Sequence, residues 1–234
     1  MAQHADHERV RTSYDSVAAE YRDRIGGELA HKAMDRALLG AVLESAAGGP
    51  VADVGCGPGH IAGWLAERGA RVVGIDLSPA MVAIARQEHP GAEFREGDLL
   101  ALPAADGEFA AAVALYSVIH LAPAELAPAF AELHRVLRPA GTLLVSFHLG
   151  TEVRRLDEWW GHRVDVDFHF LQPEAVAGLL ADAGFTVRAR LERAPLPEEA
   201  ETRRGYLLAR RNGPDGRAAV TPASRSGRGS ARPS

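Results

Sequence analysis

The sequence of 234 residues has a single cysteine, Cys56, and a single lysine, Lys32. One cysteine excludes an internal disulfide framework and a cysteine-rich zinc module. The histidines lack the close spacing of metal ligands, so we expect no metal. No apolar run reaches the roughly 18 residues that a membrane-spanning helix needs, and the N-terminus has no apolar segment of a secretory signal. These absences favour a cytoplasmic protein with no membrane partner.

Positive charge is also in short supply. The chain has 26 Lys and Arg against 31 Asp and Glu, a formal net charge of −5. Residues 213–234 are rich in Gly, Pro, Ser and Arg, which predicts a disordered basic tail. The remaining body is therefore more acidic than the whole chain, and this argues against a nucleic-acid partner, whose phosphates need neutralising. We also predict a flexible N-terminus over residues 1–11.

Strand and helix patterns alternate between these ends. Apolar runs at 50–54, 71–76 and 142–147 predict buried strands, and helical spacings follow the first two. Only a loop separates the last two predicted strands, 187–191 and 206–209, so they should be antiparallel neighbours. The class is therefore α/β, a doubly wound and mostly parallel sheet with one reversed strand at its end. Ligands of such sheets bind at the carboxyl ends of the strands.

A glycine-rich loop follows the first predicted strand, and it contains Gly55, Cys56, Gly57 and Gly59 after Asp53. Glycines there permit a tight turn and a close approach of a ligand to the backbone. The dinucleotide fingerprint would need a further glycine where this chain has a histidine, and there is no P-loop lysine. The Asp53 carboxylate would repel phosphate. The loop indicates a ligand that is not a polyphosphate, although a ligand-free turn stays open for the loop alone.

Two more carboxylates end the next two predicted strands. Asp76 is placed to accept the two hydroxyls of a ribose, as the acidic residue of nucleotide-binding units does. Asp98, between Gly97 and Leu99, is placed to accept the exocyclic amine of adenine. Either aspartate alone would be a turn or helix-capping residue. Features on three successive strand ends favour a nucleoside ligand instead.

Four segments together resemble the class I S-adenosylmethionine-dependent methyltransferases, in particular the small stand-alone group that acts on small molecules. They are D-V-G-C-G-P-G from Asp53, G-I-D-L-S-P-A-M from Gly74, G-D-L-x-x-L-P from Gly97, and the stretch Phe130–Gly141. The resemblance covers residues 12–212, which we take as the methyltransferase domain. It implies a Rossmann-like seven-stranded sheet of order 3-2-1-4-5-7-6 with strand seven antiparallel, preceded by N-terminal helices. It also implies S-adenosylmethionine as cofactor, a small-molecule acceptor, and a monomer or homodimer.

The resemblance also implies roles for single residues. The loop glycines and Cys56 would pack against the methionyl part of the cofactor, with Asp53 near its ammonium group. The residues expected at the ribose and adenine are Asp76, Leu77, Met81, Gly97, Asp98 and Leu99. Tyr14 and Tyr21 are seven positions apart on one helix face and could also contact the cofactor. Tyr116 and Ser117 would line the channel where methyl group and acceptor meet.

Histidines and tryptophans mark the acceptor side. His120 and His148 follow predicted strands four and five and are candidate general bases. Residues 151–172 interrupt the alternation and carry too many charges for a core, so we predict an acceptor lid inserted there. Its candidate acceptor residues are Trp159, Trp160, His162, Arg163 and His169.

Two other functions stay open. One is methylation of RNA or protein, against which stand the acidic body and Tyr116-Ser-Val-Ile in place of Asn/Asp-Pro-Pro-Tyr. The other is a non-catalytic cofactor-binding scaffold. Release of S-adenosylhomocysteine would distinguish any methyltransferase from the scaffold.

Overall fold

The computed structural model describes residues 2–213, so the predicted tail from residue 214 onward lies outside the described residues. The helices are α1 (Ala2–Ile25), α2 (Ala33–Ala46), α3 (His60–Ala66), α4 (Pro79–Glu88), α5 (Pro123–Val136) and α6 (Pro173–Asp182), with 3-10 turns η1 (Glu28–Ala30) and η2 (Val118–His120). The strands are β1 (Val51–Val54), β2 (Val72–Asp76), β3 (Glu93–Glu96), β4 (Phe109–Leu115), β5 (Leu137–His148), β6 (Val153–Trp159), β7 (His162–His169), β8 (Phe185–Arg193) and β9 (Arg204–Arg211). Among the described residues no helix is long and apolar enough to cross a membrane.

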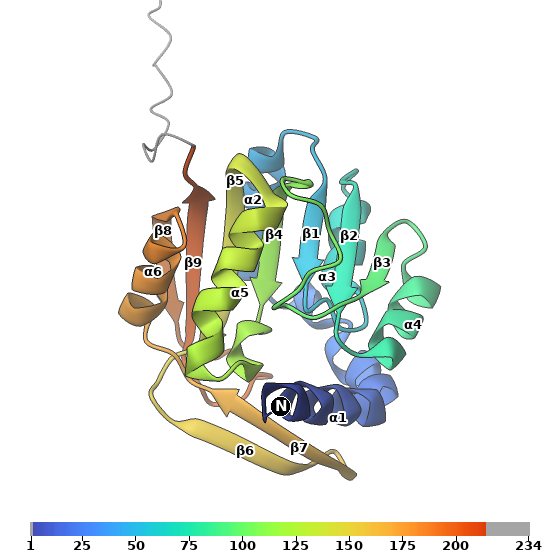
Figure 1. Cartoon of the computed structure of the whole chain (residues 1–234). Coiled ribbons are helices and arrows are strands. Elements are labelled where there is room, and N and C mark those ends of the chain that lie inside the picture. The colour runs from blue at the N-terminus through green and yellow to red at the C-terminus, as the bar shows by residue number, and fades with distance from the viewer. Residues whose placement is uncertain (1, 214–234) are drawn as a thin grey trace, which may run out of the picture.

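Seven strands form one sheet in the order β3-β2-β1-β4-β5-β9-β8 (Figure 1). The first five are parallel to their neighbours, whereas β9 is antiparallel to both β5 and β8. This confirms the predicted α/β class and the predicted strand order, because β8 and β9 are the sixth and seventh strands of the main sheet. No helix separates β8 from β9, so a parallel crossover was impossible.

Helices cover both faces of the sheet, as the near-continuous burial of its strands requires. One face packs on α5 and α6 through side chains that include Phe130, Leu133 and Leu180. The other packs on α2, α3 and α4 through Leu39 and Leu65, among others. Helices α3, α4 and α5 connect β1 to β2, β2 to β3 and β4 to β5, and the parallel strands therefore have their carboxyl ends at one end of the molecule.

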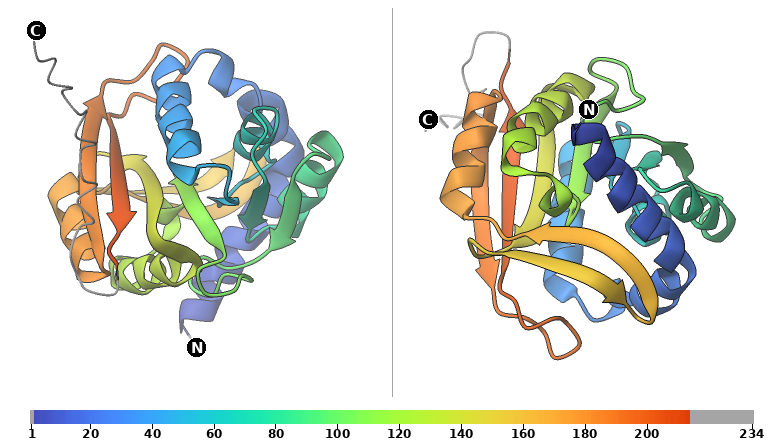
Figure 2. Two further views of the ribbon diagram at one scale, coloured as in Figure 1. Left: turned by 90° about the horizontal axis from the view of Figure 1, so that it is seen from above. Right: turned by 60° about the horizontal axis from the view of Figure 1, so that its bottom comes forward.

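Helix α1 and the β6–β7 hairpin lie together across those carboxyl ends, and Figures 1 and 2 show them running side by side. Two carboxylates of β7 fix the helix, because the Arg9 guanidinium lies 2.6 Å from Asp165 Oδ1 and 3.1 Å from Asp167 Oδ2. At the other side the Asp15 carboxylate accepts from Ser78 Oγ at 2.5 Å and from the backbone N–H of Ala80 at 3.1 Å. These contacts tie the N-terminal half and the middle of α1 to the hairpin and to the start of α4.

Two expectations need correction here. Residues 2–11 belong to α1 rather than to a flexible N-terminus, because His7 and Arg9 find carboxylate partners far along the chain. The predicted lid is an ordered β-hairpin, and its β7 strand contributes to the interior: Val164 and Val166 are 8% and 0% exposed. The charged residues of β7 alternate with buried ones along the strand, so the high charge of the segment does not prevent one of its faces from joining the core.

Candidate active site

The glycine-rich loop lies at the carboxyl end of β1, with Gly55, Gly57 and Gly59 all in the left-handed region at φ 75°, 52° and 86°. A Cβ atom at Gly55 would come within 2.3 Å of Ser117 Cβ, so a side chain does not fit there. At Gly57 an added Cβ would meet only Tyr21, at 3.9 Å. The loop therefore leaves its backbone open toward α1, and the Gly57 N–H is held at 2.7 Å by the Asp76 carboxylate.

A cavity opens between this loop, the ends of β2 to β4, and α1; we call it the cofactor cavity. Most residues that the sequence assigned to cofactor binding line it. They are Tyr14, Tyr21, Gly55, Cys56, Gly57, Asp76, Leu77, Gly97, Asp98, Leu99 and Tyr116. Two residues assigned to the acceptor, Ser117 and His120, line it as well.

Three predicted cofactor residues lie behind the cavity wall instead. Gly59 is the N-cap of α3 and packs against Ala85 and Phe94 of the neighbouring elements. The Met81 side chain is fully buried. Asp53 is 1% exposed, and its Oδ2 has no hydrogen-bond partner among the described residues. Asp53 therefore lies beneath the loop rather than at its mouth. Burial raises the pKa of its carboxyl to about 7.

Three polar residues of the cavity were not predicted from the sequence. His7 reaches in from α1, with Nδ1 2.6 Å from Asp98 Oδ2. Glu28 and His60 form a second pair, with 3.3 Å between Oε1 and Nε2. Burial raises the pKa of Glu28, but His60 and Lys32 outweigh it, so the pKa lies below its usual value. The spacing of Glu28 and Lys32 by four residues was the only signal available in the sequence.

His120 is a half-buried residue that connects α1 to the hairpin. Its Nε2 lies 2.8 Å from the Tyr14 hydroxyl, and its Nδ1 lies 3.1 Å from the Asp167 carbonyl oxygen. Because a carbonyl only accepts, Nδ1 carries the proton and Nε2 accepts from Tyr14. Burial lowers the pKa of this imidazole to about 4. With both ring nitrogens engaged, His120 is not the acceptor-facing base that the sequence suggested.

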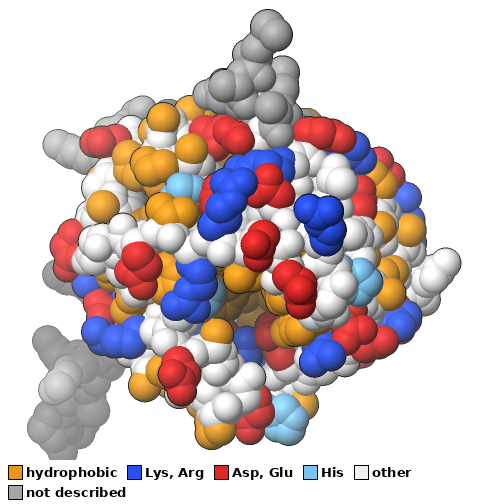
Figure 3. All heavy atoms as spheres, turned by 90° about the horizontal axis from the view of Figure 1, so that it is seen from below, with side chains coloured by type: hydrophobic (Ala, Val, Ile, Leu, Met, Phe, Trp, Pro, Cys, Tyr) orange, Lys and Arg blue, Asp and Glu red, His pale blue; other side chains and the backbone are white. Residues whose placement is uncertain are grey.

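A second and larger cavity, of about 750 Å³, opens beside the first; we call it the acceptor cavity. Four residues line both cavities, namely Tyr14, Tyr21, Glu28 and Tyr116. Figure 3, which views this end of the molecule, shows a hollow with hydrophobic side chains inside and charges of both signs around it. Three of the residues predicted to contact the acceptor, Trp159, Trp160 and His148, line this cavity.

The other predicted lid residues do not line either cavity. His162, Arg163 and His169 belong to β7, whose cavity-facing ring is Phe168 instead. Successive side chains of β7 point to opposite faces, so Arg163 and His169 lie on the face opposite Phe168, whereas His162 lies on the face of Phe168 but outside the cavity lining. The prediction that these three residues contact the acceptor is therefore wrong, because none of them lines either cavity.

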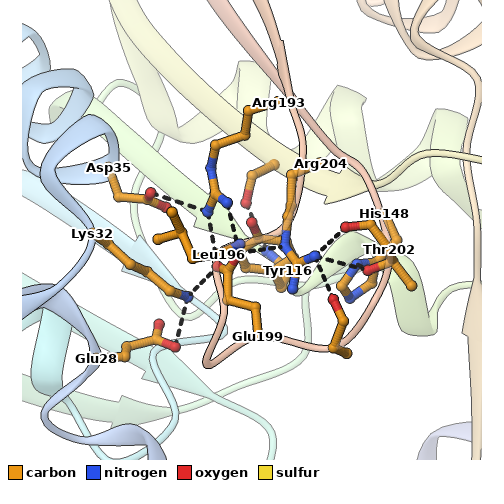
Figure 4. A network of polar contacts seen from close by, with 12 residues as sticks. Glu28, Lys32, Asp35, Tyr116, His148, Arg193, Leu196, Glu199, Thr202 and Arg204 are labelled. Carbon is orange, nitrogen blue, oxygen red and sulfur yellow. Dashed lines mark hydrogen bonds and ion pairs between the residues drawn. The ribbon is translucent and has the colours of Figure 1, made fainter.

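His148 lies at the end of β5 and is held by Thr202, whose Oγ1 is 2.8 Å from Nδ1 (Figure 4). The imidazole stacks on Phe170 with 5.3 Å between ring centroids and lies 5.2 Å from the Tyr116 ring. Burial lowers the pKa of His148 to about 4, with help from the positive charges of Arg204 and Arg154. The ring is therefore neutral at pH 7 and is a weak base.

A buried polar network stands behind His148 and Tyr116, and Figure 4 shows its members. The Tyr116 hydroxyl lies 2.9 Å from that of Tyr206, which donates to Asp35 at 2.9 Å. Arg193 joins Asp35 to Glu199, and Glu199 in turn pairs with Lys32 at 3.2 Å. The network fixes Tyr116, a non-glycine residue at φ 56°, at the junction of the two cavities.

The fold and the site define a class of protein. The methyltransferase domain family matches residues 51–141, the stretch from β1 to the start of β5. Magnesium protoporphyrin IX methyltransferase from Synechocystis PCC 6803, crystallised with S-adenosylmethionine bound, superimposes with a TM-score of 0.69 at 19% identity, covering 88% of this chain and 97% of that one. This chain belongs to the class I S-adenosylmethionine-dependent methyltransferases.

Two relatives give the comparison at sequence level. A demethylmenaquinone methyltransferase from Thermus thermophilus is 37% identical over 169 residues, which cover 60% of this chain and 76% of that protein. A malonyl-acyl-carrier-protein O-methyltransferase from Serratia marcescens is 33% identical over 161 residues, covering 69% of this chain and 58% of that protein. The chain thus spans less than two thirds of the Serratia relative, and the two relatives are named for different acceptors.

Proposed function

We propose that this protein binds S-adenosylmethionine in the cofactor cavity and transfers its methyl group to a small molecule held in the acceptor cavity. The observation that carries the proposal is that the two cavities meet at shared residues, among them Tyr14 and Tyr116. Ligands bound in both would touch there, which is the arrangement that a direct transfer requires.

The polar groups of the cofactor cavity suit a nucleoside. Asp76 receives N–H donors from Gly57 at 2.7 Å and Ser78 at 2.9 Å, which orient its carboxylate at the end of β2. We assign this carboxylate to the ribose hydroxyls. Asp98, oriented by the Leu100 N–H at 2.8 Å and by His7, is assigned to the adenine edge between Leu77 and Leu99.

The charge at the junction suits a cationic cofactor. Glu28 lines both cavities, and its lowered pKa keeps it ionised. Its carboxylate would stabilise the positive charge of the methionyl end, a role that the sequence gave to Asp53. The buried position of Asp53 makes Glu28 the better candidate.

S-adenosylmethionine supplies a methyl group that its sulfonium already activates, so the protein mainly has to align the acceptor and exclude water. Helix α1 and the β6–β7 hairpin contribute Tyr14, Tyr21 and Trp159 to the lining of the acceptor cavity, and we assign them the exclusion of water. Tyr116, fixed by the buried network, positions the two ligands. His148 is too weakly basic to remove a proton from an unactivated hydroxyl, and we assign it a positioning role.

The proposal can be tested with the purified chain. Calorimetry should detect binding of S-adenosylmethionine, and a panel of candidate acceptors should yield S-adenosylhomocysteine together with a product that has gained one methylene mass. Labelled cofactor offered with RNA and with peptides tests the macromolecular alternative. Absence of cofactor binding, or label that appears only in RNA or peptide, would contradict the proposal.

A further inference from the structure

Two groups of aromatic rings line the acceptor cavity. In the first group, Tyr21 lies 5.7 Å from Trp159, and Trp159 lies 4.8 Å from Trp160, between ring centroids. In the second group, His148 stacks on Phe170 at an interplanar angle of 30°. Rings in these numbers offer flat apolar surface that suits a planar, conjugated ligand.

Most cations of the acceptor cavity already have a carboxylate partner. Lys32 lies 2.7 Å from Glu28, Arg204 lies 3.2 Å from Glu199, and Arg24 pairs with a glutamate one helical turn away. Arg154 is the exception, because it forms no ion pair with any carboxylate among residues 6–213. Its guanidinium lies 5.2 Å from the centroid of the Phe170 ring, so this uncompensated charge borders the second aromatic group.

The alternation of strand β6 aims Arg154 at the cavity. Arg154 and Leu156 both line the acceptor cavity. Arg155, between them, points to the opposite face and pairs with Asp165 at 2.6 Å. The two adjacent arginines therefore differ in two respects: Arg154 faces the cavity without a carboxylate partner, whereas Arg155 faces away and is paired with Asp165 and Asp167.

Positive charge predominates around His148. Arg204 and Arg154 act on its ring as positive charges, and the Glu199 carboxylate opposes them less strongly. One unpaired carboxylate, Glu198, also lines the cavity, but it belongs to the loop between β8 and β9 rather than to the aromatic group around His148. The His148 end of the cavity is therefore suited to an anion, and the competing ligand would be a cation near Glu198.

We propose, on the basis of the function proposed above, that the methyl acceptor is a planar aromatic molecule with an ionised oxygen group such as a carboxylate. Its ring lies among Tyr21, Trp159, Trp160 and Phe170, and its anion pairs with Arg154. Arg154 then determines specificity without contributing to cofactor binding, because it does not line the cofactor cavity.

The test measures binding of defined probes by calorimetry, with the acceptor cavity open and the cofactor cavity saturated by S-adenosylhomocysteine. The probes are naphthoate, its neutral analogue naphthamide, and the cation naphthylmethylammonium. We expect the wild-type chain to bind naphthoate about tenfold more tightly than naphthamide, which corresponds to about 1.4 kcal/mol. Arg154→Met should reduce this preference to about twofold or less.

Arg155→Met is the matched control, because it removes the same charge from the neighbouring position on the other strand face. It should retain the preference for naphthoate, and both variants should bind S-adenosylhomocysteine like the wild type. Equal binding of naphthoate and naphthamide by the wild type, a preference that survives in Arg154→Met, or tightest binding of the ammonium probe would each overturn the inference. Failure to bind S-adenosylhomocysteine at all would contradict the proposed function instead, which keeps the two failures distinguishable.

Discussion

His7 and Asp98 lie 91 positions apart in the chain, and their side chains meet at 2.6 Å beside the cofactor cavity. The second ring nitrogen of His7 lies 3.2 Å from Glu125 Oε1, so the imidazole bridges two carboxylates. This bridge connects the first turns of α1 to the carboxyl end of β3 and to α5. The adenine side of the cavity is therefore closed by a contact whose strength depends on a proton.

We expect this contact to weaken at alkaline pH. Burial lowers the pKa of His7, but Asp98 and Glu125 outweigh it, so the pKa lies above 6.5. A histidine with a raised folded-state pKa contributes its full stabilisation below pH 6.5, and the contribution is lost as pH rises through the folded-state pKa. Hydrogen exchange of the amides near His7, corrected for intrinsic rates, should become faster between pH 6 and pH 9.

The control for this prediction is His7→Gln, which cannot carry the charge. Its exchange in the first turns of α1 should be fast at both pH values. Protection that is independent of pH in the wild type, or pH dependence that persists in His7→Gln, would show that the bridge does not hold the helix.

Asp76→Asn should weaken binding of S-adenosylmethionine by about a hundredfold. Two hydrogen bonds from ribose hydroxyls to a charged acceptor are worth about 1.5–3 kcal/mol each, and an amide keeps only part of this. Asp106→Asn is the control, since its 82% exposed side chain lies far from either cavity lining. Calorimetry should separate the two variants, and equal affinities would refute the assignment of Asp76 to the ribose.

Gly59→Ala should destabilise the fold far more than Gly69→Ala. Both glycines have nearly the same left-handed φ, 86° and 85°, so the backbone cost of about 1–2 kcal/mol is common to both. Only at Gly59 would the new Cβ come within 2.9 Å of Ala85 and 3.0 Å of Phe94. Crowding in a packed interior adds about 1–3 kcal/mol. Urea unfolding measures the difference, and similar losses at both positions would contradict the packing described for the loop.

Asp53→Asn should stabilise the ligand-free protein at neutral pH. The raised pKa means that the unfolded chain ionises near pH 4 while the folded protein holds the proton until about pH 7. Stability of the wild type therefore falls across this window relative to the variant, by at most about 4 kcal/mol, and the gap is constant above it. Thermal unfolding at pH 4 and pH 8 tests this: the two proteins should differ little at pH 4 and clearly at pH 8.

The same variant also tests the assignment of charge to Glu28. Because Asp53 lies behind the cavity wall, Asp53→Asn should affect cofactor affinity less than Asp76→Asn does. A loss of cofactor affinity as large as that of Asp76→Asn would indicate that Asp53, rather than Glu28, pairs with the methionyl ammonium, as the family resemblance implied.

The sequence determined the class of the sheet and the part of the cofactor cavity that follows directly on the strands. Apolar runs, glycine loops and the missing crossover between β8 and β9 predicted a mostly parallel sheet with an antiparallel ending, because these are local signals of short range, and the family resemblance implied the strand order. The glycine loop, Asp76 and Asp98 were predictable for the same reason: each follows directly on a strand, and parallel strands bring their carboxyl ends to one edge.

Only the tertiary structure decided what covers that edge. His7 pairs with Asp98 and Arg9 with Asp165, both more than 90 positions away, and the local pattern of residues 1–11 does not predict these contacts. The same holds for the acceptor side, where the pairing register of β6 and β7 places Arg154 on the cavity face and Arg155 and Arg163 on the opposite face. Register is set by contacts between strands and by the turn that joins them, and a shift by one residue would exchange every one of these side chains between the two faces.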